Sequence, residues 1–262
     1  MNSNDISWFN LVLGSLIVVL PVIIFQYYRT GLVRQMLIAF ARMSIQLLFV
    51  GFYLKYIFAL DSIAINLLWI IIMMIAAAIS IVRRSELSTK AFIMPVAAGI
   101  FADVILNAII YAYIVMDTDT FLHARYLIPI TGMVIGNCIT NAIIGIRAFY
   151  NNLKDNEIRY RYALIAGATT SEALRPFFAD AFRTSFAPTI ASNATIGLIW
   201  LPGMMTGQIL GGSDPMTAIK YQILIVLSIF VGGVITVFTA LRLSLKYSID
   251  TRHNLNHSIY KS

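Results

Sequence analysis

Amide and thioether side chains occur inside two strongly apolar stretches of this chain. In the first stretch they recur every four residues, which places them on one face of a helix. In the second they follow a proline and lie among glycines, and such irregular backbone is tolerated at membrane depth only where it is buried in protein or lines a wet cavity. The sequence therefore predicts that both stretches line a passage for a polar solute. The predicted lining residues are Met133, Asn137, Asn141, Pro202, Met204, Met205 and Gln208.

A carboxylate, Asp103, also lies within an apolar stretch, four residues before Asn107 on the same predicted helix face. An ionisable group at membrane depth is costly and indicates a functional site by default, although it can also fix helix packing. The candidate ligands for a transported metal ion are the carboxylate oxygens of Asp103 and the thioether sulfurs of Met204 and Met205. Sulfur is a soft ligand and suits copper(I) better than iron. Methionine is also a common filler of helix cores, so packing stays open as the alternative for these residues.

The elements that carry these side chains belong to a membrane protein. The chain is 59% hydrophobic and 12% charged, with a mean hydropathy of +0.81, whereas soluble domains carry about 25% charged residues. Its net charge of +7 comes from basic residues scattered between apolar spans, which argues for membrane topology and against nucleic acid as a partner. No soluble block is long enough for a separate domain, so we expect one transmembrane domain over residues 1–262, in contact with membrane lipid.

Seven apolar stretches reach the length of about 20 residues that a spanning helix needs. The chain is therefore expected to be all-α and polytopic. The predicted spans are Ser7–Tyr28, Arg42–Leu60, Ile63–Val82, Ala91–Met116, Tyr126–Tyr150, Phe186–Leu210 and Met216–Leu243.

The charges of the connecting segments predict the orientation. Sixteen of the 19 Lys and Arg residues fall in alternate connections and the C-terminal tail, whereas the opposite set holds only Lys55, Arg125 and Lys220. Positively charged connections face the cytoplasm. This pattern requires an odd number of spans, with the N-terminus outside and the C-terminus in the cytoplasm.

The longest of the predicted cytoplasmic connections covers about residues 151–183. We expect a helical extension over Asn152–Ala166, a stop at Gly167 and a capping box between Thr169 and Glu172. A short helix, Thr170–Arg175, would then end at Pro176 before the chain returns to the membrane. Such a segment suits docking to a soluble partner, and a loop with no partner stays open as the alternative.

Several short segments together resemble the FetB-type permeases, which are seven-span membrane subunits of a bacterial ABC transporter implicated in iron export, with plant relatives linked to aluminium tolerance. The resemblance covers most of the chain and is densest after Ile128. The matching segments are Lys55–Phe58, Ile128–Ile130, Gly132–Met133, Gly136–Asn137, Tyr150–Leu153, Gly167–Thr169, Pro188–Thr189, Gly197–Leu198, Leu201–Met205, Asp214–Pro215 and Ala218–Gln222.

The resemblance implies a multi-pass permease of the bacterial plasma membrane, the cell inner membrane, that serves metal homeostasis by exporting iron or another metal ion. It implies a homodimer of permeases with two cytosolic ABC ATPase subunits. ATP and magnesium would bind to those subunits and no cofactor to this chain, which is not itself an enzyme and has no phosphate-binding loop motif. Asp103 does not belong to the family pattern. The implied ATPase-coupling residues are Gly167, Ala168, Thr169, Glu172 and Arg175.

Two other functions stay open. An ion-coupled secondary transporter could use Asp103 as its proton carrier, although such proteins often carry several intramembrane charges and internal repeats. A membrane scaffold or sensor could bind a soluble partner without transporting anything. The polar, proline-containing stretch from Trp200 to Asp214 argues against a scaffold, because lipid contact alone does not require it.

Overall fold

The computed structural model describes residues 7–250 and 253–260. These residues form helices, joined by turns and three isolated β-bridges. The chain divides into two compact units, residues 1–60 with 210–212 and residues 61–209 with 213–262. Each unit is described by itself. The predicted all-α, polytopic membrane fold is confirmed, since the described residues include six helices long and apolar enough to cross a membrane.

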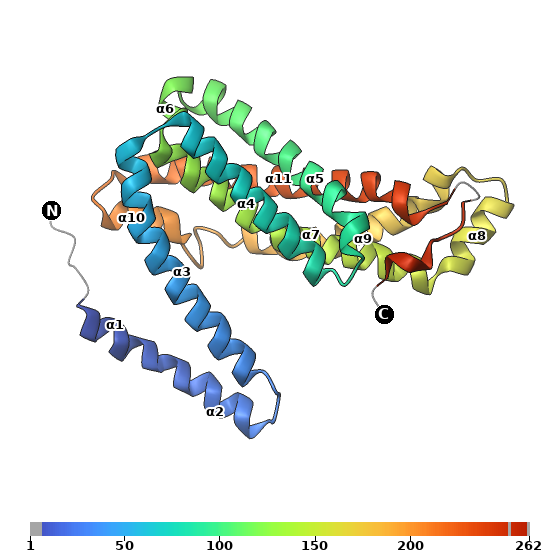
Figure 1. Cartoon of the computed structure of the whole chain (residues 1–262), viewed down its shortest axis with the longest axis horizontal. Coiled ribbons are helices and arrows are strands. Elements are labelled where there is room, and N and C mark those ends of the chain that lie inside the picture. The colour runs from blue at the N-terminus through green and yellow to red at the C-terminus, as the bar shows by residue number, and fades with distance from the viewer. Residues whose placement is uncertain (1–6, 251–252, 261–262) are drawn as a thin grey trace. The chain divides into compact units, whose positions relative to one another are not determined.

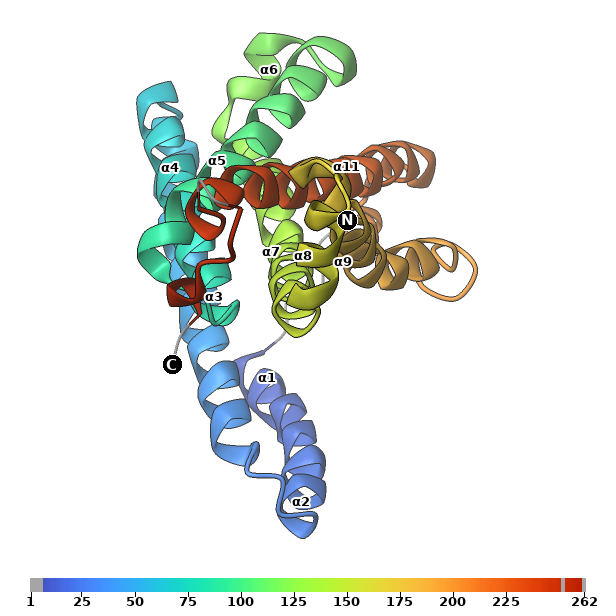
Figure 2. The same ribbon diagram turned by 90° about the vertical axis from the view of Figure 1, so that its right-hand side faces the viewer.

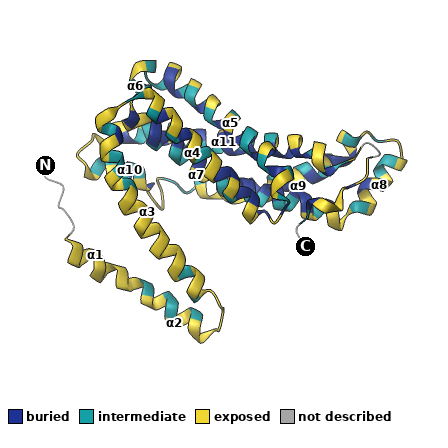
Figure 3. Ribbon diagram, in the orientation of Figure 1, coloured by how far each residue is buried: buried dark blue, intermediate teal, exposed yellow. Residues whose placement is uncertain are grey.

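The first unit is a helical hairpin. One arm, Trp8–Tyr27, is built from α1 (Trp8–Ser15), η1 (Leu16–Val18) and α2 (Val19–Tyr27), and the other arm is α3 (Val33–Leu60). The turn between them uses positive φ angles at Arg29 and Gly31. Nearly all of its apolar side chains are exposed (Figure 3), as expected for helices whose solvent is lipid.

The second unit holds the remaining helices and nearly all of the buried core. Figures 1 and 2 show its long helices lying side by side, with α11 packed along α5 and α7. Its elements are α4 (Ile63–Arg84), α5 (Thr89–Ile110), the π-helical turn η2 (Tyr111–Val115), α6 (Thr118–Leu122), α7 (Ala124–Asp155), α8 (Glu157–Ile165), α9 (Thr170–Asn193), α10 (Gly203–Leu210), α11 (Pro215–Ser248) and η3 (His257–Ile259).

Glycines allow α11 to approach its neighbours closely. A Cβ atom at Gly99 of α5 would lie 2.6 Å from the backbone oxygen of Thr236, and one at Gly145 of α7 would lie 2.9 Å from Val237 Cγ1. On α11, Gly232 packs directly against the Asp103 carboxylate. Glycine is unfavourable in the interior of a helix. The close packing of α11 explains why glycine nevertheless occurs at these three positions. Gly136, by contrast, has open space around the position of a Cβ atom.

The predicted span Phe186–Leu210 was wrong as a continuous helix. Helix α9 ends at Asn193, and α10 begins only at Gly203. Between them Gly197 adopts φ +84°, a conformation that glycine tolerates and other residues rarely adopt. Six of the seven predicted spans correspond to long apolar helices, whereas the remaining stretch is a helix end, a turn and a short helix.

The predicted short helix Thr170–Arg175 was also wrong. Helix α9 continues through Pro176 and Pro188 to Asn193. An interior proline removes one backbone hydrogen bond, but Leu174 and Phe177 on either side are buried in the core, and their packing holds the helix across the proline. The predicted extension of the preceding span is interrupted at Asn156, which separates α7 from α8. The predicted orientation of the chain stays a prediction.

Substituting Gly99→Ala should destabilise the second unit, because the new methyl group would meet immobile backbone of α11. Overpacking of this kind costs about 1–3 kcal/mol. Thermal unfolding in detergent should show a lower Tm for Gly99→Ala than for wild type. Gly136→Ala is the matched control, and its Tm should be unchanged or higher. Equal Tm values for the two variants would contradict the close contact.

Candidate functional site

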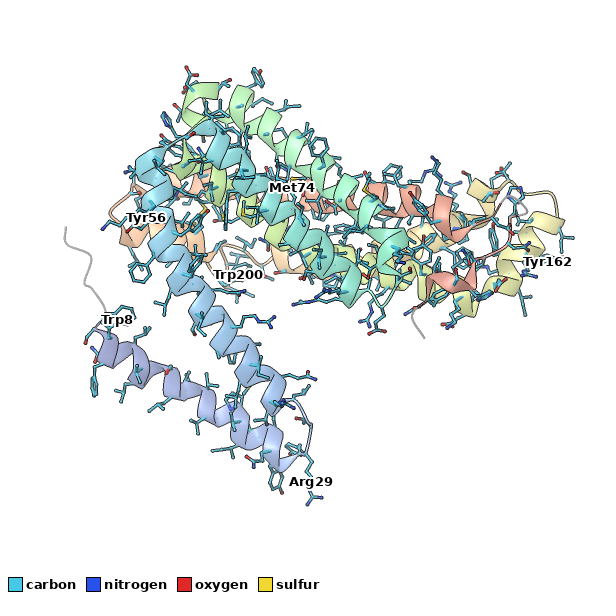
Figure 4. The ribbon with its side chains drawn as sticks, viewed as in Figure 1. Trp8, Arg29, Tyr56, Met74, Tyr162 and Trp200 are labelled. Atoms are coloured by element: carbon cyan, nitrogen blue, oxygen red, sulfur yellow. The ribbon has the colours of Figure 1, made fainter. Side chains whose placement is uncertain are left out.

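The turn between α9 and α10 has its own hydrogen bonds. The Gly197 backbone N–H donates to the Trp200 carbonyl at 3.0 Å, and the Trp200 indole donates to Thr195 Oγ1 at 3.3 Å. Trp200 thereby closes the turn that interrupts the helix (Figure 4). Pro202 then leads into α10 and its carbonyl accepts from the Thr206 N–H at 3.1 Å. The break is therefore a structured turn that places Met204 and Met205 on a separate short helix.

A cavity of about 500 Å³ lies beside this turn. It is bounded by α7, α9, α10 and α11, all within the second unit. Its polar lining consists of side-chain amides and hydroxyls, together with two thioethers, and none of its lining residues is charged. The polar and sulfur-containing residues of the lining are Met133, Asn137, Thr189, Ser192, Asn193, Met204 and Gln222.

A second cavity of about 460 Å³ lies beside the first and shares four lining residues with it. Met205 and Leu201 line this second cavity only. The shared residues are Asn193, Ile196, Gln222 and Val226. Gln222, from α11, is 8% exposed, and its Oε1 atom makes no hydrogen bond within the described part of the chain. A buried, unsatisfied acceptor is rare, and Gln222 is one of the four residues that both cavities share.

The structure brings together some of the residues predicted from sequence as a passage lining, but not all of them. Met133, Asn137, Pro202 and Met204 surround the first cavity, and Met205 the second. Asn141 and Gln208, the two remaining predicted residues, line neither cavity. Asn141 is 6% exposed and accepts a hydrogen bond from Thr189 at 3.2 Å, and Gln208 has a buried, unpartnered Oε1.

The cavity residues contributed by α9, chiefly Thr189 and Asn193, were not predicted from the sequence, and Gln222 of α11 was included only as the end of the stretch from Ile199 that is predicted to line a passage. Gln222 is an amide inside an apolar helix, the same signal that singled out Asn137 and Asn141. Thr189 and Asn193 lie four residues apart and share a helix face. They could have been found only if the helix containing Pro188 had been predicted to continue to Asn193.

Asp103 is not part of either cavity. It is fully buried between α5 and α11, where Oδ1 accepts from Asn107 Nδ2 at 2.7 Å and Oδ2 from Thr236 Oγ1 at 3.5 Å. The structure thus separates Asp103 from Met204 and Met205, the other predicted metal ligands. Within the described residues, no cluster of three or more His, Cys, Asp or Glu side chains could hold a metal ion.

The turn between α8 and α9 carries the predicted coupling residues Gly167, Ala168 and Thr169. Gly167 adopts φ +93° and ends α8, and Thr169 starts α9 with a complete capping box to Glu172. The Thr169 N–H donates to Glu172 Oε2 at 2.8 Å, and its hydroxyl donates to the same oxygen at 2.7 Å. These hydrogen bonds favour the charged carboxylate, so they lower the pKa of Glu172. The exposed Arg175 lies one helical turn further along α9.

The C-terminal tail contacts this turn and the neighbouring helices. His253 Nδ1 hydrogen-bonds with the Thr170 hydroxyl at 2.9 Å, and His257 Nε2 lies 3.1 Å from Glu157 Oε2 on α8. Tyr260 donates to the Tyr150 carbonyl of α7 at 2.8 Å, and burial raises the pKa of its phenol. The tail therefore ties α7, α8 and the start of α9 together.

Helix α8 exposes apolar side chains at the end of the second unit. Ile158, Tyr162 and Ile165 are 86%, 73% and 84% exposed, and their spacing places them on one helix face. Figure 4 shows Tyr162 projecting from this end of the unit. At about 1.5 Å per residue, the 32-residue α7 is about 48 Å long, longer than the hydrocarbon thickness of about 30 Å. Helix α8, which follows α7, thus presents an exposed apolar face at this end of the unit.

The comparisons with known proteins show what this chain resembles. A model of the "Uncharacterised protein family (UPF0014)" matches residues 8–249. The chain is 33% identical over 259 residues to the "Probable iron export permease protein FetB" of Escherichia coli, covering 97% of each chain. It is 29% identical over 238 residues to the "Protein ALUMINUM SENSITIVE 3" of Arabidopsis thaliana, covering 88% of this chain and 85% of the relative.

A membrane protein of the same family in Bacillus subtilis, YjkA, is 30% identical over 229 residues. No solved structure matches the chain. The relatives, whose descriptions name a permease and membrane proteins, agree with the apolar helices in identifying a multi-pass membrane protein.

The capping box should make the start of α9 sensitive to pH. The folded-state pKa of Glu172 is lowered, so its ionised carboxylate stabilises the start of α9. This stabilisation is fully present above the unfolded-state pKa of about 4.3 and is lost as the pH falls through the folded-state pKa. Hydrogen exchange should show protection at residues 169–173 that declines over this acidic range.

Glu172→Ala should lower this protection several-fold at neutral pH and remove its pH dependence, because alanine has no acceptor for the Thr169 N–H and hydroxyl. Ser171→Ala, a change at an exposed neighbour, is the matched control and should behave as wild type. Equal protection in Glu172→Ala and wild type at pH 7 would contradict a functioning capping box.

Proposed function

We propose that this chain, which belongs to the membrane protein family UPF0014, is the permease subunit of an ABC transporter that exports iron or another metal ion. The permease forms a homodimer, and two cytosolic ATPase subunits bind and hydrolyse ATP with magnesium. The cargo assignment takes support from the relative described as a probable iron export permease.

One observation carries the proposal: helix α9 runs without interruption from the α8–α9 turn to the first cavity. Its first residue, Thr170, follows the N-cap Thr169, and its last turns contribute Thr189, Ser192 and Asn193 to the cavity lining. A helix of 24 residues spans about 36 Å. A displacement at the turn is thus transmitted to the cavity by a single continuous helix.

The energy source acts on the α8–α9 turn. The chain has no Gly-x-x-x-x-Gly-Lys-Ser/Thr motif for binding phosphate, so nucleotide binds to a partner. The exposed face of α8, formed by Ile158, Tyr162 and Ile165, and the adjacent residues Gly167–Arg175 form the surface for that partner. ATP-driven closure of the partner pushes on this surface and shifts a two-state equilibrium between inward-open and outward-open permease.

The burial of Asp103 weighs against the alternative of proton-coupled transport. A proton carrier must exchange its proton with water on alternate sides of the membrane. Asp103 is fully buried against Gly232, is hydrogen-bonded to Asn107 and Thr236, and lines neither cavity. Its contacts join α5 to α11, which is a packing role.

The test is metal efflux from proteoliposomes that contain the permease and the ATPase subunit with which it copurifies. ATP should drive efflux of Fe²⁺, and replacing residues 167–172 with a Gly/Ser linker should abolish efflux and copurification. The conservative control is Ser171→Ala, which should retain both. A permease that copurifies with no ATPase, even after crosslinking, would overturn the proposal.

Asp103→Asn separates the two transport mechanisms in the same assay. Asparagine keeps the size of the side chain and can hydrogen-bond to Asn107 and Thr236, so ATP-driven efflux should stay within a few-fold of wild type. Efflux that follows an imposed pH gradient without ATP, and that Asp103→Asn abolishes, would establish the proton-coupled alternative instead.

A further inference from the structure

Polar side chains in the first cavity are accessible to a ligand. Asn137 and Ser192 are exposed and Asn193 is half-buried, and all three line the cavity. The Asn137 Nδ2 donates to the Met133 carbonyl at 2.8 Å, so its Oδ1 stays available as an acceptor. Ser192 offers a hydroxyl, and Asn193 offers two N–H donors and a carbonyl acceptor. The cavity can therefore both donate hydrogen bonds to a ligand and accept them from it.

The lining carries no charge that could hold an ion. None of the residues around either cavity is Asp, Glu, Lys, Arg or His. An ion that left water for such a lining would lose hydration without meeting an opposite charge, which is strongly unfavourable. A neutral molecule gives up only hydrogen bonds to water, which the amides and hydroxyls replace. The preferred ligand is therefore uncharged.

The second cavity differs from the first in polarity. Apart from two amides, its lining consists of glycine and apolar side chains, among them Leu201, Ile223 and Leu227. It adjoins the first cavity through shared lining residues that include Asn193 and Ile196. The volumes, about 500 and 460 Å³, lie within the range of about 300–1,000 Å³ that is typical of small-molecule sites. A ligand that fits both cavities has hydrogen-bonding groups at one end and an apolar part at the other.

We propose that the two adjoining cavities bind one neutral amphiphile. Its hydrogen-bonding head lies against Asn137, Ser192 and Asn193 in the first cavity, and its apolar part lies against Leu201 and Ile223 in the second. This inference rests on the proposed function only where it concerns the cargo. A metal ion that uses the same cavity crosses as an uncharged complex of such a molecule, and not as a free ion.

The test compares probes that share one brominated chain and differ in the charge of the head. Bromine quenches indole fluorescence on contact, and Trp200 lines the first cavity, so Trp200 is the reporter once Trp8→Phe and Trp69→Phe remove the other two tryptophans. The full-length permease, alone in phosphatidylcholine nanodiscs, is titrated with each probe. The neutral ω-bromoundecanamide should quench Trp200 saturably. The permanently charged ω-bromoundecyl sulfate and ω-bromoundecyltrimethylammonium should bind at least about tenfold more weakly.

Two variants test the two ends of the ligand separately. Asn137→Leu removes a hydrogen-bonding group and should weaken the amide probe by about 2–10-fold. Thr140→Leu is its matched control, since Thr140 is an exposed polar residue of the same helix that lines neither cavity. Ile223→Phe fills part of the second cavity and should also weaken the probe. Ile190→Phe is the second control, because Ile190 is equally exposed, at 56%, and lies outside both cavities. Both controls should bind as wild type.

Competition identifies the source of the ligand. Displacement of the probe by dioleoylglycerol would assign the site to a neutral membrane lipid. Displacement by the uncharged gallium(III) complex of octanohydroxamic acid would assign it to a metal chelate. Both results support a neutral amphiphile, whereas displacement by free Zn²⁺ would overturn it.

Three further results would overturn the proposal: quenching that rises linearly with probe concentration and never saturates, equal affinities for the neutral and charged probes, or an affinity that neither Asn137→Leu nor Ile223→Phe changes. The assay contains no ATPase. Its failure is therefore distinct from a failure of ATP-driven efflux, which would overturn the proposed function instead.

Discussion

Where a helix is interrupted inside an apolar segment, its backbone N–H and C=O groups need hydrogen-bond partners other than the helix. The chain provides such partners between α9 and α10. Residues 194–202 close a turn on themselves through Gly197, Trp200 and Thr195. Because the turn provides these partners, the helix can stop at Asn193 and a separate short helix can carry Met204 and Met205. Both cavities depend on that interruption, because residues of the turn and of α10 line each of them.

Close packing elsewhere in the second unit keeps the surroundings of this turn fixed. Helix α11 lies against α5 at Gly99 and Gly232 and against α7 at Gly145, so it cannot move far from either. The buried Asp103 belongs to this contact rather than to the cavities. At the opposite end of α9, the capping box and the C-terminal tail fix the α8–α9 turn to α7 and α8. Helix α9 therefore connects the α8–α9 turn at one end with the lining of the first cavity at the other.

Much of this architecture could be predicted from the sequence, because apolar length and helix capping are local properties. Six spans, the stop at Gly167 and the capping box at Thr169 and Glu172 follow from such signals. The continuation of α9 through Pro176 could not, since it depends on the burial of Leu174 and Phe177 against distant helices. The break after Asn193 was hidden because Leu198, Ile199 and Leu201 keep the stretch apolar where the backbone is irregular.

The residues of the candidate site were predicted from one criterion, a polar or sulfur-containing side chain inside an apolar stretch, and this criterion succeeded only in part. Met133, Asn137, Pro202 and Met204 share one cavity, whereas Gln208, chosen by the same criterion, lines neither. Asp103 shows the limit of that criterion: composition identifies an intramembrane carboxylate, but only packing reveals that Gly232 and Thr236 enclose it. Gln222 lies on α11, and only the fold brings it beside Asn193.

The proposed function requires that the cavity at the end of α9 opens and closes with the nucleotide state of the proposed ATPase partner. The most direct measurement is labelling of Ser192→Cys, in a Cys138→Ala background, by a membrane-impermeant thiol reagent in the permease–ATPase complex. Ser192 lines the first cavity, whereas Ile190→Cys, on the same helix but outside both cavities and 56% exposed, is the control. The account predicts that a nonhydrolysable ATP analogue changes the labelling rate of Ser192→Cys at least several-fold and leaves that of Ile190→Cys unchanged. A Ser192→Cys protein that is never labelled, or whose labelling rate is the same with and without nucleotide, would contradict it.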